Sequence, residues 1–253
     1  MKVIGLLSGK GGVGKTTSAI NLAAGLNHYG LKTVVADGNI TTPNVGIYMG
    51  LPVTPVNLHN VLKGENKASE AIHHHDSGLQ LLTGSLALQD MQGLKLSRMK
   101  ELKKLDAEYV ILDGAAGLGR EVLTVIEHSD EIVIVTNPEL PAITDALKTI
   151  RLAEELGKSV LGVLLTRAKG DDLDVSVRNV EALVEYPVLG VIPEESKMRE
   201  ALSNKDAIVH THPDSHASQN YLKLAANISG RTYLAPLRKM TWAEKVWMII
   251  RGS

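Results

Sequence analysis

Residues 10–17 read Lys-Gly-Gly-Val-Gly-Lys-Thr-Thr and directly follow the apolar run of residues 3–7. With the preceding glycine they meet the phosphate-loop pattern G-x-x-x-x-G-K-[ST]. Such a loop closes backbone N–H groups around phosphate oxygens, and the positive end of the next helix strengthens the field. An inert glycine-rich turn is the alternative, but the amphipathic run of residues 18–27 favours nucleotide binding. The candidate binding residues are Gly11, Gly12, Val13, Gly14, Lys15, Thr16 and Thr17.

Strand-like and helix-like segments alternate along the whole chain, which predicts an α/β fold. We expect a three-layer sandwich in which helices cover both faces of a mostly parallel sheet. Predicted strands are 2–8, 32–37, 79–83, 109–113, 131–136, 159–166 and 188–192. Predicted helices are 16–28, 57–63, 95–105, 119–128, 141–156, 175–185, 196–203 and 217–229. We expect residues 1–235 to form one domain that contains the phosphate loop, and residues 236–253 to form a separate tail.

The composition narrows the classes of function. The chain has no cysteine, which excludes disulfides, thiolate-held iron–sulfur clusters and cysteine nucleophiles. A net charge of −1 gives no global field that would recruit nucleic acid or an anionic surface. No secretory signal and no apolar stretch of membrane-spanning length is visible, so we expect a cytoplasmic protein.

Two predicted strands end in a carboxylate. One of them is the segment Val110-Ile111-Leu112-Asp113, which lies downstream of the phosphate loop. An Asp at this place in proteins with a phosphate loop reaches the bound metal ion. The alternative is a structural Asp, because buried strands also end in Asp as a turn or a helix cap. The segment after it, residues 114–119, is rich in small residues and is either a plain loop or a γ-phosphate sensor. Asp37 ends the other strand and is followed by Gly38 and Asn39.

Lys10 is the discriminating residue. A phosphate loop needs only Lys15, so Lys10 is either a solvated surface lysine or a cation that reaches a partner subunit's phosphates. In the second case it would act in trans, as an arginine finger does.

These segments together resemble the MinD/ParA family of deviant-Walker ATPases. The likeness extends over nearly the whole chain, with the archaeal MinD-like branch the closest. It is carried by residues 10–17, 37–44, 113–121, 135–139, 165–167 and 191–194.

The resemblance implies a P-loop NTPase fold of the SIMIBI type and an ATPase that dimerises face to face around two ATP molecules. Lys10 would be the signature lysine that holds this homodimer. Lys15 and Thr16 would bind triphosphate and Mg²⁺, with Asp113 and Asp37 supporting the metal. Glu139 would touch the partner's nucleotide, and the base would lie near Thr166, Arg167, Pro193 and Glu194.

Three departures from the family pattern matter. Asn39 stands where a second acidic residue usually polarises the attacking water; Asn can orient a water but cannot take its proton. We therefore expect slow hydrolysis, although a substitution introduced to trap nucleotide would look the same. Ala115-Ala116 replaces a frequent proline, and Thr166 replaces an Asn that often reads the adenine.

Residues 237–251 carry both tryptophans of the chain. Trp242, Val246, Ile249 and Ile250 recur at helical spacing, and the cationic residues lie mostly off that face. This pattern indicates an interfacial membrane anchor, as in MinD-type proteins, or a last helix packed on the domain. Dimerisation would double the anchors and so couple ATP binding to membrane binding.

Other polar clusters favour plainer interpretations. The histidines of residues 73–75 and 210–216 could suggest metal ligands. Consecutive His side chains splay apart and cannot converge on one ion, so solvated loops are the expected interpretation. The basic stretch of residues 95–104 is expected to be a solvated face, with a DNA or partner contact as the alternative.

The sequence therefore favours an ATP-dependent switch that associates with the cytoplasmic face of the membrane and positions an unknown regulatory or cargo protein. The alternative is a ParA-like partition ATPase whose ATP dimer binds DNA non-specifically. A cluster-assembly ATPase would need cysteines, and the chain has none. A phosphotransferase that acts on a small molecule is not supported either, because no segment of the sequence resembles a lid.

Overall fold

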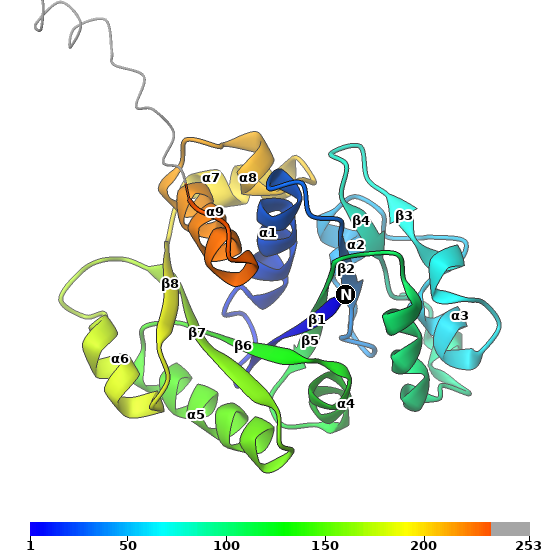
Figure 1. Ribbon diagram of the computed structural model, residues 1–253, viewed down its shortest axis with the longest axis horizontal. Coiled ribbons are helices and arrows are strands. Elements are labelled where there is room, and N and C mark those ends of the chain that lie inside the picture. The colour runs from blue at the N-terminus through cyan, green and yellow to red at the C-terminus, as the bar shows by residue number, and fades with distance from the viewer. Residues whose placement is uncertain (234–253) are drawn as a thin grey trace, which may run out of the picture.

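The computed structural model describes residues 1–233, which build an eight-stranded sheet between two layers of helices (Figure 1). The strand order is β3-β4-β2-β5-β1-β6-β7-β8, and every pair is parallel except β3 with β4. The strands are β1 (Lys2–Ser8), β2 (Thr33–Asp37), β3 (His73–His74), β4 (Gln80–Leu82), β5 (Tyr109–Ala116), β6 (Glu131–Thr136), β7 (Ser159–Ala168) and β8 (Val188–Pro193).

The helices divide between the two faces of the sheet. One face carries α1 (Lys15–His28), α2 (Val45–Tyr48), α7 (Ser196–Ser203), α8 (Ile208–Thr211) and α9 (His216–Ser229). The other carries α3 (Leu58–Lys63), α4 (Arg120–His128), α5 (Leu140–Glu155), α6 (Val177–Val184) and the 3₁₀ segments η1 (Ala68–Ala71), η2 (Leu88–Met91) and η3 (Leu96–Lys104). Each face has its own buried apolar cluster, because the central strands are buried on both sides.

This architecture confirms the predicted fold class, and each predicted strand has its counterpart in the sheet. The predicted helix of residues 95–105 is present as the 3₁₀ helix of residues 96–104, whose apolar residues (Leu96, Met99, Leu102) recur every three positions. The prediction that the clustered histidines lie in solvated loops is wrong for several of them: His210 lies on α8 and His216 begins α9. His73 and His74 form the short antiparallel strand β3 instead of a solvated loop, and His73 Nε2 lies 2.6 Å from the carbonyl oxygen of Val56.

No helix within residues 1–233 is both long and apolar enough to cross a bilayer. The predicted amphipathic tail, residues 237–251, lies outside the described residues.

Parallel strands bring their carboxyl ends to one edge of the sheet, and the phosphate loop joins β1 to α1 at that edge. Gly9 begins the loop directly against α5. A Cβ placed on Gly9 would lie 2.2 Å from the carbonyl oxygen of Asp145 and 2.3 Å from its carbon. Only a glycine therefore lets the chain pass α5 at this position, immediately before Lys10.

We predict that Gly9→Ala lowers the free energy of unfolding by about 1–3 kcal/mol, because the added methyl group must push the loop away from α5. Thermal unfolding measures the loss. Gly11→Ala is the matched control, because a Cβ placed on Gly11 would have no atom within 4 Å and its φ is not positive. Equal melting temperatures for the two variants would contradict the close approach.

Candidate functional site

The phosphate loop has the backbone geometry of an anion cradle. Gly12 and Gly14 adopt φ angles of 80° and 87°, in the left-handed region that favours glycine. Gly14 is the N-cap of α1 and makes no side-chain cap hydrogen bond. The first N–H groups of α1 therefore stay available for an anion, which the helix dipole also attracts.

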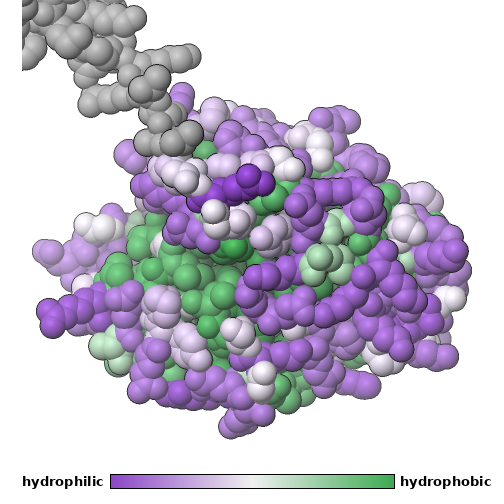
Figure 2. All heavy atoms as spheres, in the orientation of Figure 1, coloured by the Kyte–Doolittle hydropathy of each residue, from purple (hydrophilic) through white to green (hydrophobic). Residues whose placement is uncertain are grey.

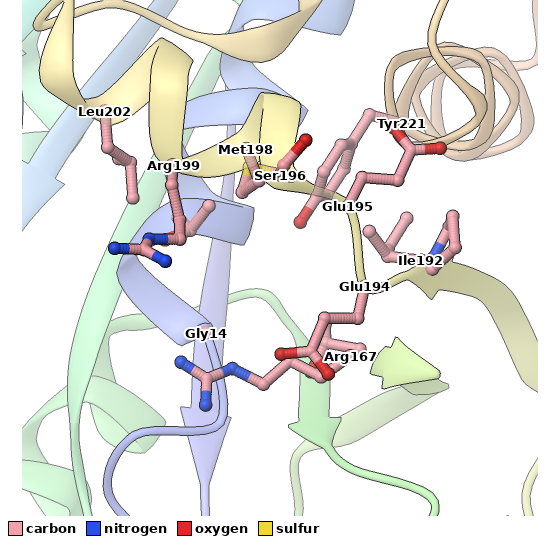
Figure 3. Close-up of a pocket in the computed structure, with 13 residues that line it drawn as sticks. Gly14, Arg167, Ile192, Glu194, Glu195, Ser196, Met198, Arg199, Leu202 and Tyr221 are labelled. Atoms are coloured by element: carbon pink, nitrogen blue, oxygen red, sulfur yellow. The ribbon is translucent and has the colours of Figure 1, made fainter. Parts of the chain in front are cut away.

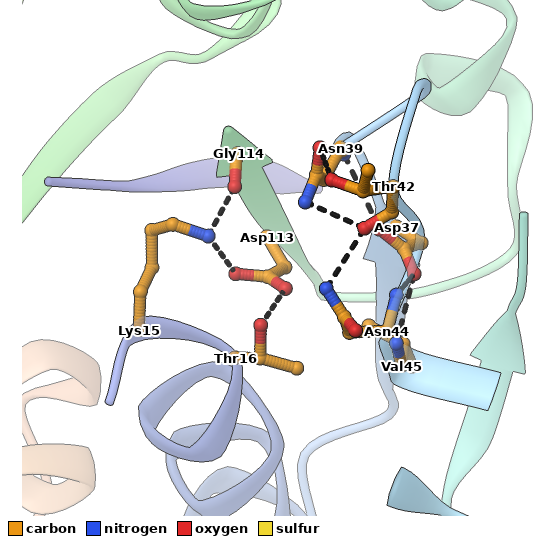
Figure 4. A network of polar contacts seen from close by, with 9 residues as sticks. All are labelled: Lys15, Thr16, Asp37, Asn39, Thr42, Asn44, Val45, Asp113 and Gly114. Carbon is orange, nitrogen blue, oxygen red and sulfur yellow. Dashed lines mark hydrogen bonds and ion pairs between the residues drawn. The ribbon is translucent and has the colours of Figure 1, made fainter. Parts of the chain in front are cut away.

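Lys15 and Thr16 both bond to Asp113 (Figure 4). Lys15 Nζ donates to Asp113 Oδ1 at 2.8 Å and to the carbonyl oxygen of Gly114. The Thr16 hydroxyl donates to Asp113 Oδ2 at 2.6 Å. Lys15 is 8% exposed and Asp113 is fully buried, so each charge depends on the other for compensation.

Asp37 lies next to Asp113, on the neighbouring strand. The two residues are paired in register, Asp37 at the end of β2 and Asp113 within β5, and both side chains are fully buried. Burial raises the pKa of Asp37, and the Asp113 charge raises it further, to about 8, against the opposing backbone donors of Asn44 and Val45. Adjacent buried carboxylates of this kind favour a cation between or beside them.

The oxygen ligands at this edge fit Mg²⁺. The Thr16 hydroxyl and two carboxylates are hard oxygen donors of the type Mg²⁺ prefers. Residues 1–233 contain no group of three or more His, Asp or Glu side chains able to hold a metal by themselves. Such a site therefore needs phosphate and water oxygens to complete an octahedron, as is usual for Mg²⁺ in nucleotide sites.

The segment from Asp37 to Val45, which we call the first switch segment, is organised by the Asp37 carboxylate. That carboxylate accepts backbone N–H bonds from Asn39 at 3.2 Å, Asn44 at 2.7 Å and Val45 at 2.8 Å. The Asn39 amide donates to the Thr42 carbonyl at 2.7 Å, and its oxygen accepts from the Thr42 hydroxyl at 3.1 Å. Asn39 thus lines the phosphate cavity with both ends of its amide engaged.

A second contact joins the first switch segment to the start of α4. Glu121 Oε1 accepts from the Thr41 N–H at 2.9 Å and also from the Thr41 hydroxyl. Sequence reasoning assigned no role to either residue. An acidic residue in the first turn of a helix is ordinary capping composition, so the sequence carried no signal for this long-range bond.

Two adjoining cavities form one cleft along the sheet edge. The first, about 530 Å³, lies over the phosphate loop and is lined by Gly11, Gly12, Lys15, Thr16, Asn39 and Glu121 among others. The second, about 370 Å³, lies toward β8 and α7. Both are lined by Gly14, Thr17, Arg167 and Leu202, so a ligand can extend from one into the other.

The second cavity has an apolar body and charged residues at its mouth (Figure 3). Ile192 and Pro193 come from β8, and Met198 comes from α7. Figure 3 shows the side chains of Arg167 and Glu194 together at one end of this cavity. A planar base fits such an apolar slot, and its predicted neighbours Arg167, Pro193 and Glu194 all line it.

Thr166 also lines the second cavity, but its hydroxyl is engaged with the protein. It bonds to the carbonyl oxygen of Val13 and, at 3.1 Å, to Asn137 Oδ1. This residue ties the end of β7 to the phosphate loop. Its hydroxyl is therefore not free to read a base in this arrangement.

Lys10 and Glu139 lie outside this cleft. Both side chains are exposed, and neither lines either cavity. Glu139 is the N-cap of α5, the helix against which Gly9 packs. The structure of one chain thus separates these two residues from the phosphate-binding group that contains Lys15, Thr16 and Asp113.

Comparisons with known proteins agree with this geometry. Residues 1–229 match the ParA family model described as a NUBPL iron-transfer P-loop NTPase. An uncharacterised ATP-binding protein of Methanocaldococcus jannaschii is 35% identical, over 93% of this chain and 90% of its own length.

Solved structures give the same result. The cell division ATPase MinD of Pyrococcus furiosus superposes with a TM-score of 0.86 at 30% identity, covering 90% of this chain and 98% of that one. The septum site-determining protein MinD of Pyrococcus horikoshii, complexed with Mg-ADP, gives 0.85 at 28% identity, covering 90% and 95%. A phosphate loop, a buried Lys–Asp pair and a family match over nearly all described residues lead to one conclusion: the chain belongs to the ParA family of P-loop NTPases, among its MinD-like ATPases.

Proposed function

We propose that this protein is an ATP-dependent switch that dimerises when it binds Mg-ATP, associates with a membrane surface and resets on hydrolysis. The observation that supports the proposal is the buried pair between Lys15 of the phosphate loop and Asp113 of β5, together with the exposed Lys10 at the start of the loop. In this proposal Lys15 contacts the chain's own nucleotide. Lys10 contacts the nucleotide of the partner.

Nucleotide binding would rearrange the buried pair. Lys15 Nζ leaves Asp113 and the Gly114 carbonyl to contact the terminal phosphates, while the loop N–H groups hold the phosphate oxygens. Thr16 and Asp113 would hold Mg²⁺, with Asp37 nearby, and the bound ion would supply positive charge against the phosphates. The base occupies the apolar cavity beside Pro193, between β8 and α7.

The same rearrangement would reach the surface through the first switch segment and through residues 114–119. Lys15 bonds to the backbone of Gly114, at the start of the small-residue segment 114–119. Glu121, just beyond that segment, holds Thr41 of the first switch segment. A change at the terminal phosphate therefore moves two loops that share one edge of the molecule, which is the edge a dimer partner would meet.

Hydrolysis is proposed to be slow. Asn39 lines the phosphate cavity, but an amide cannot accept the proton of an attacking water. Its amide nitrogen donates one N–H to the Thr42 carbonyl at 2.7 Å, which leaves the second N–H to orient a water but supplies no base.

The homodimer, the membrane and an unidentified regulatory or cargo protein are the proposed partners. The protein would then be cytoplasmic and peripherally bound to the membrane, through residues 237–251. DNA binding by a ParA-like dimer remains the alternative function. Local pairing of the basic segment argues against it, because Lys103 bonds to Asp130 at 2.5 Å and Lys104 to Glu101 at 2.9 Å.

We predict that Asn39→Asp raises the steady-state rate of ATP hydrolysis by up to about 10²-fold, the range that a positioned general base supplies. Phosphate release at saturating Mg-ATP measures it. Asn39→Ala is the control for simple loss of the Thr42 bond and should not accelerate turnover. Equal rates for the wild-type protein and Asn39→Asp would contradict the slow-hydrolysis proposal.

A second prediction concerns Lys10. The wild-type protein should form a dimer in saturating Mg-ATP, and Lys10→Ala should remain monomeric while still binding nucleotide, because the lost cation faces the partner's phosphates. Light scattering after size exclusion gives the mass, and fluorescent-nucleotide titration gives the affinity. Lys148 is an exposed lysine on α5, outside the phosphate loop, so the control variant Lys148→Ala should dimerise normally. A wild-type protein that stays monomeric would remove the basis of the switch.

The third prediction separates membrane from DNA. With Mg-ATP, the full chain should co-sediment with vesicles that contain anionic lipid, and a chain truncated after Pro236 should not. Retardation of DNA at physiological salt is measured in parallel, with and without ATP. Retained vesicle binding by the truncated chain would exclude the tail as the anchor, and ATP-dependent DNA binding alone would favour the partition function.

A further inference from the structure

Apolar side chains gather on one face of the molecule, between α9 and α5 and over β7 and β8 (Figure 2). We call the residues Leu161, Leu189 and Ile228 the β8 patch. They come from β7, β8 and α9, they are half-buried, and all three pack against the same core cluster. Contiguous exposed apolar surface of this kind usually marks an interaction site.

Strand β8 makes this face unusual. It is the last strand in the sheet order, so within residues 1–233 one of its two sides has no strand partner. Its sequence, VLGVIP, carries no charge, and all of its residues except Ile192 are half-buried. Edge strands are normally protected by charge, by proline or by a covering segment. Among the described residues, β8 has only Pro193 at its end and the Glu181 carboxylate at its start, which accepts from the Val188 N–H at 2.9 Å.

The described chain ends beside this face. After the left-handed C-cap Gly230, the chain turns back along α9, and the Tyr233 hydroxyl donates to Gln219 Oε1. Lys223 Nζ lies 5.4 Å from the centre of the Tyr233 ring. Tyr233 also packs against the core cluster that supports the β8 patch. The chain therefore enters residue 234 from the surface of α9.

The remaining length of chain is sufficient to reach the patch. Residues 234–236 span up to about 10 Å when extended, and a helix that begins at residue 237 adds about 8 Å before Trp242. Tyr233 lies against Lys223, and Ile228 is five positions further along α9, about 8 Å along the helix axis, so Trp242 can reach the patch. A helix over residues 237–251 would be about 22 Å long and a six-residue strand is about 20 Å long, so the two lengths match.

We propose that residues 237–251 dock on the β8 patch of the same chain when no lipid is present. The segment presents Trp242, Val246, Ile249 and Ile250 at helical spacing, an apolar face that complements the patch. A short connection gives the tail an effective concentration in the millimolar range, which favours it over a second copy. The docked tail covers the open side of β8 and withholds its apolar face from a membrane.

This docking does not depend on the proposed dimerisation or hydrolysis, and it is measured without nucleotide or lipid. Both tryptophans of the chain, Trp242 and Trp247, lie in the tail, so tryptophan fluorescence reports on the tail alone. In the full-length protein we expect emission at short wavelength and weak quenching by acrylamide. Leu189→Glu and Ile228→Glu should each move the emission to longer wavelength and raise the quenching constant several-fold.

Leu88→Glu is the matched control, because Leu88 is 81% exposed on η2, away from the patch, and should leave the fluorescence unchanged. Circular dichroism and nucleotide binding confirm that each variant is folded. Patch variants should also bind anionic vesicles more tightly, because docking no longer competes with lipid.

Three results would overturn the proposal: freely quenched tryptophans in the wild-type protein, patch variants that match the control, or a short-wavelength emission that disappears on dilution. The last would assign the patch to a second copy of the chain. Failure of vesicle binding alone would count against the proposed membrane function and not against docking.

Discussion

The buried ion pair between Lys15 and Asp113 is the interaction on which the site depends. At 8% and 0% exposure neither charge is well hydrated, and loss of one partner from such a pair costs about 3–5 kcal/mol. The pair therefore holds the phosphate loop, α1 and β5 in fixed relation before any ligand arrives. It also means that a ligand able to release Lys15 must itself carry strong negative charge close to the loop, together with a cation for the carboxylate left behind. A triphosphate with Mg²⁺ meets both conditions.

A second carboxylate, Asp37, connects the phosphate-binding edge to the first switch segment. Asp37 accepts three backbone N–H bonds within the first switch segment. The position of that loop is therefore set by a carboxylate that lies next to Asp113. Glu121 then connects the loop to α4 through Thr41. The first switch segment, β5 and α4 are thus linked by these hydrogen bonds as well as by the apolar cluster that contains Ile40, Leu112 and Val122.

Local pattern predicted the sheet, the phosphate loop and the two strand-terminal carboxylates, because each depends on residues adjacent in sequence. The helix of residues 96–104 was also predicted, although its 3₁₀ form, which agrees with the three-residue spacing of Leu96, Met99 and Leu102, was not. Contacts between distant segments were not. The hydroxyl of Thr166 is engaged by the Val13 carbonyl, and Glu121 bonds to Thr41 across 80 positions. Nothing in either local sequence distinguishes these partners from solvent.

Lys10 shows how the fold and the proposed dimer require each other. The loop has two lysines five positions apart, yet only Lys15 faces the cleft, while Lys10 is exposed and lines neither cavity. Lys10 follows Gly9, whose Cβ position is occupied by the backbone of Asp145 on α5, so the start of the loop lies directly against that helix. Under the proposed function this exposed cation neutralises phosphate on a partner molecule. The close contact of Gly9 with α5 thus lies immediately before the lysine that the proposal assigns to the partner's nucleotide.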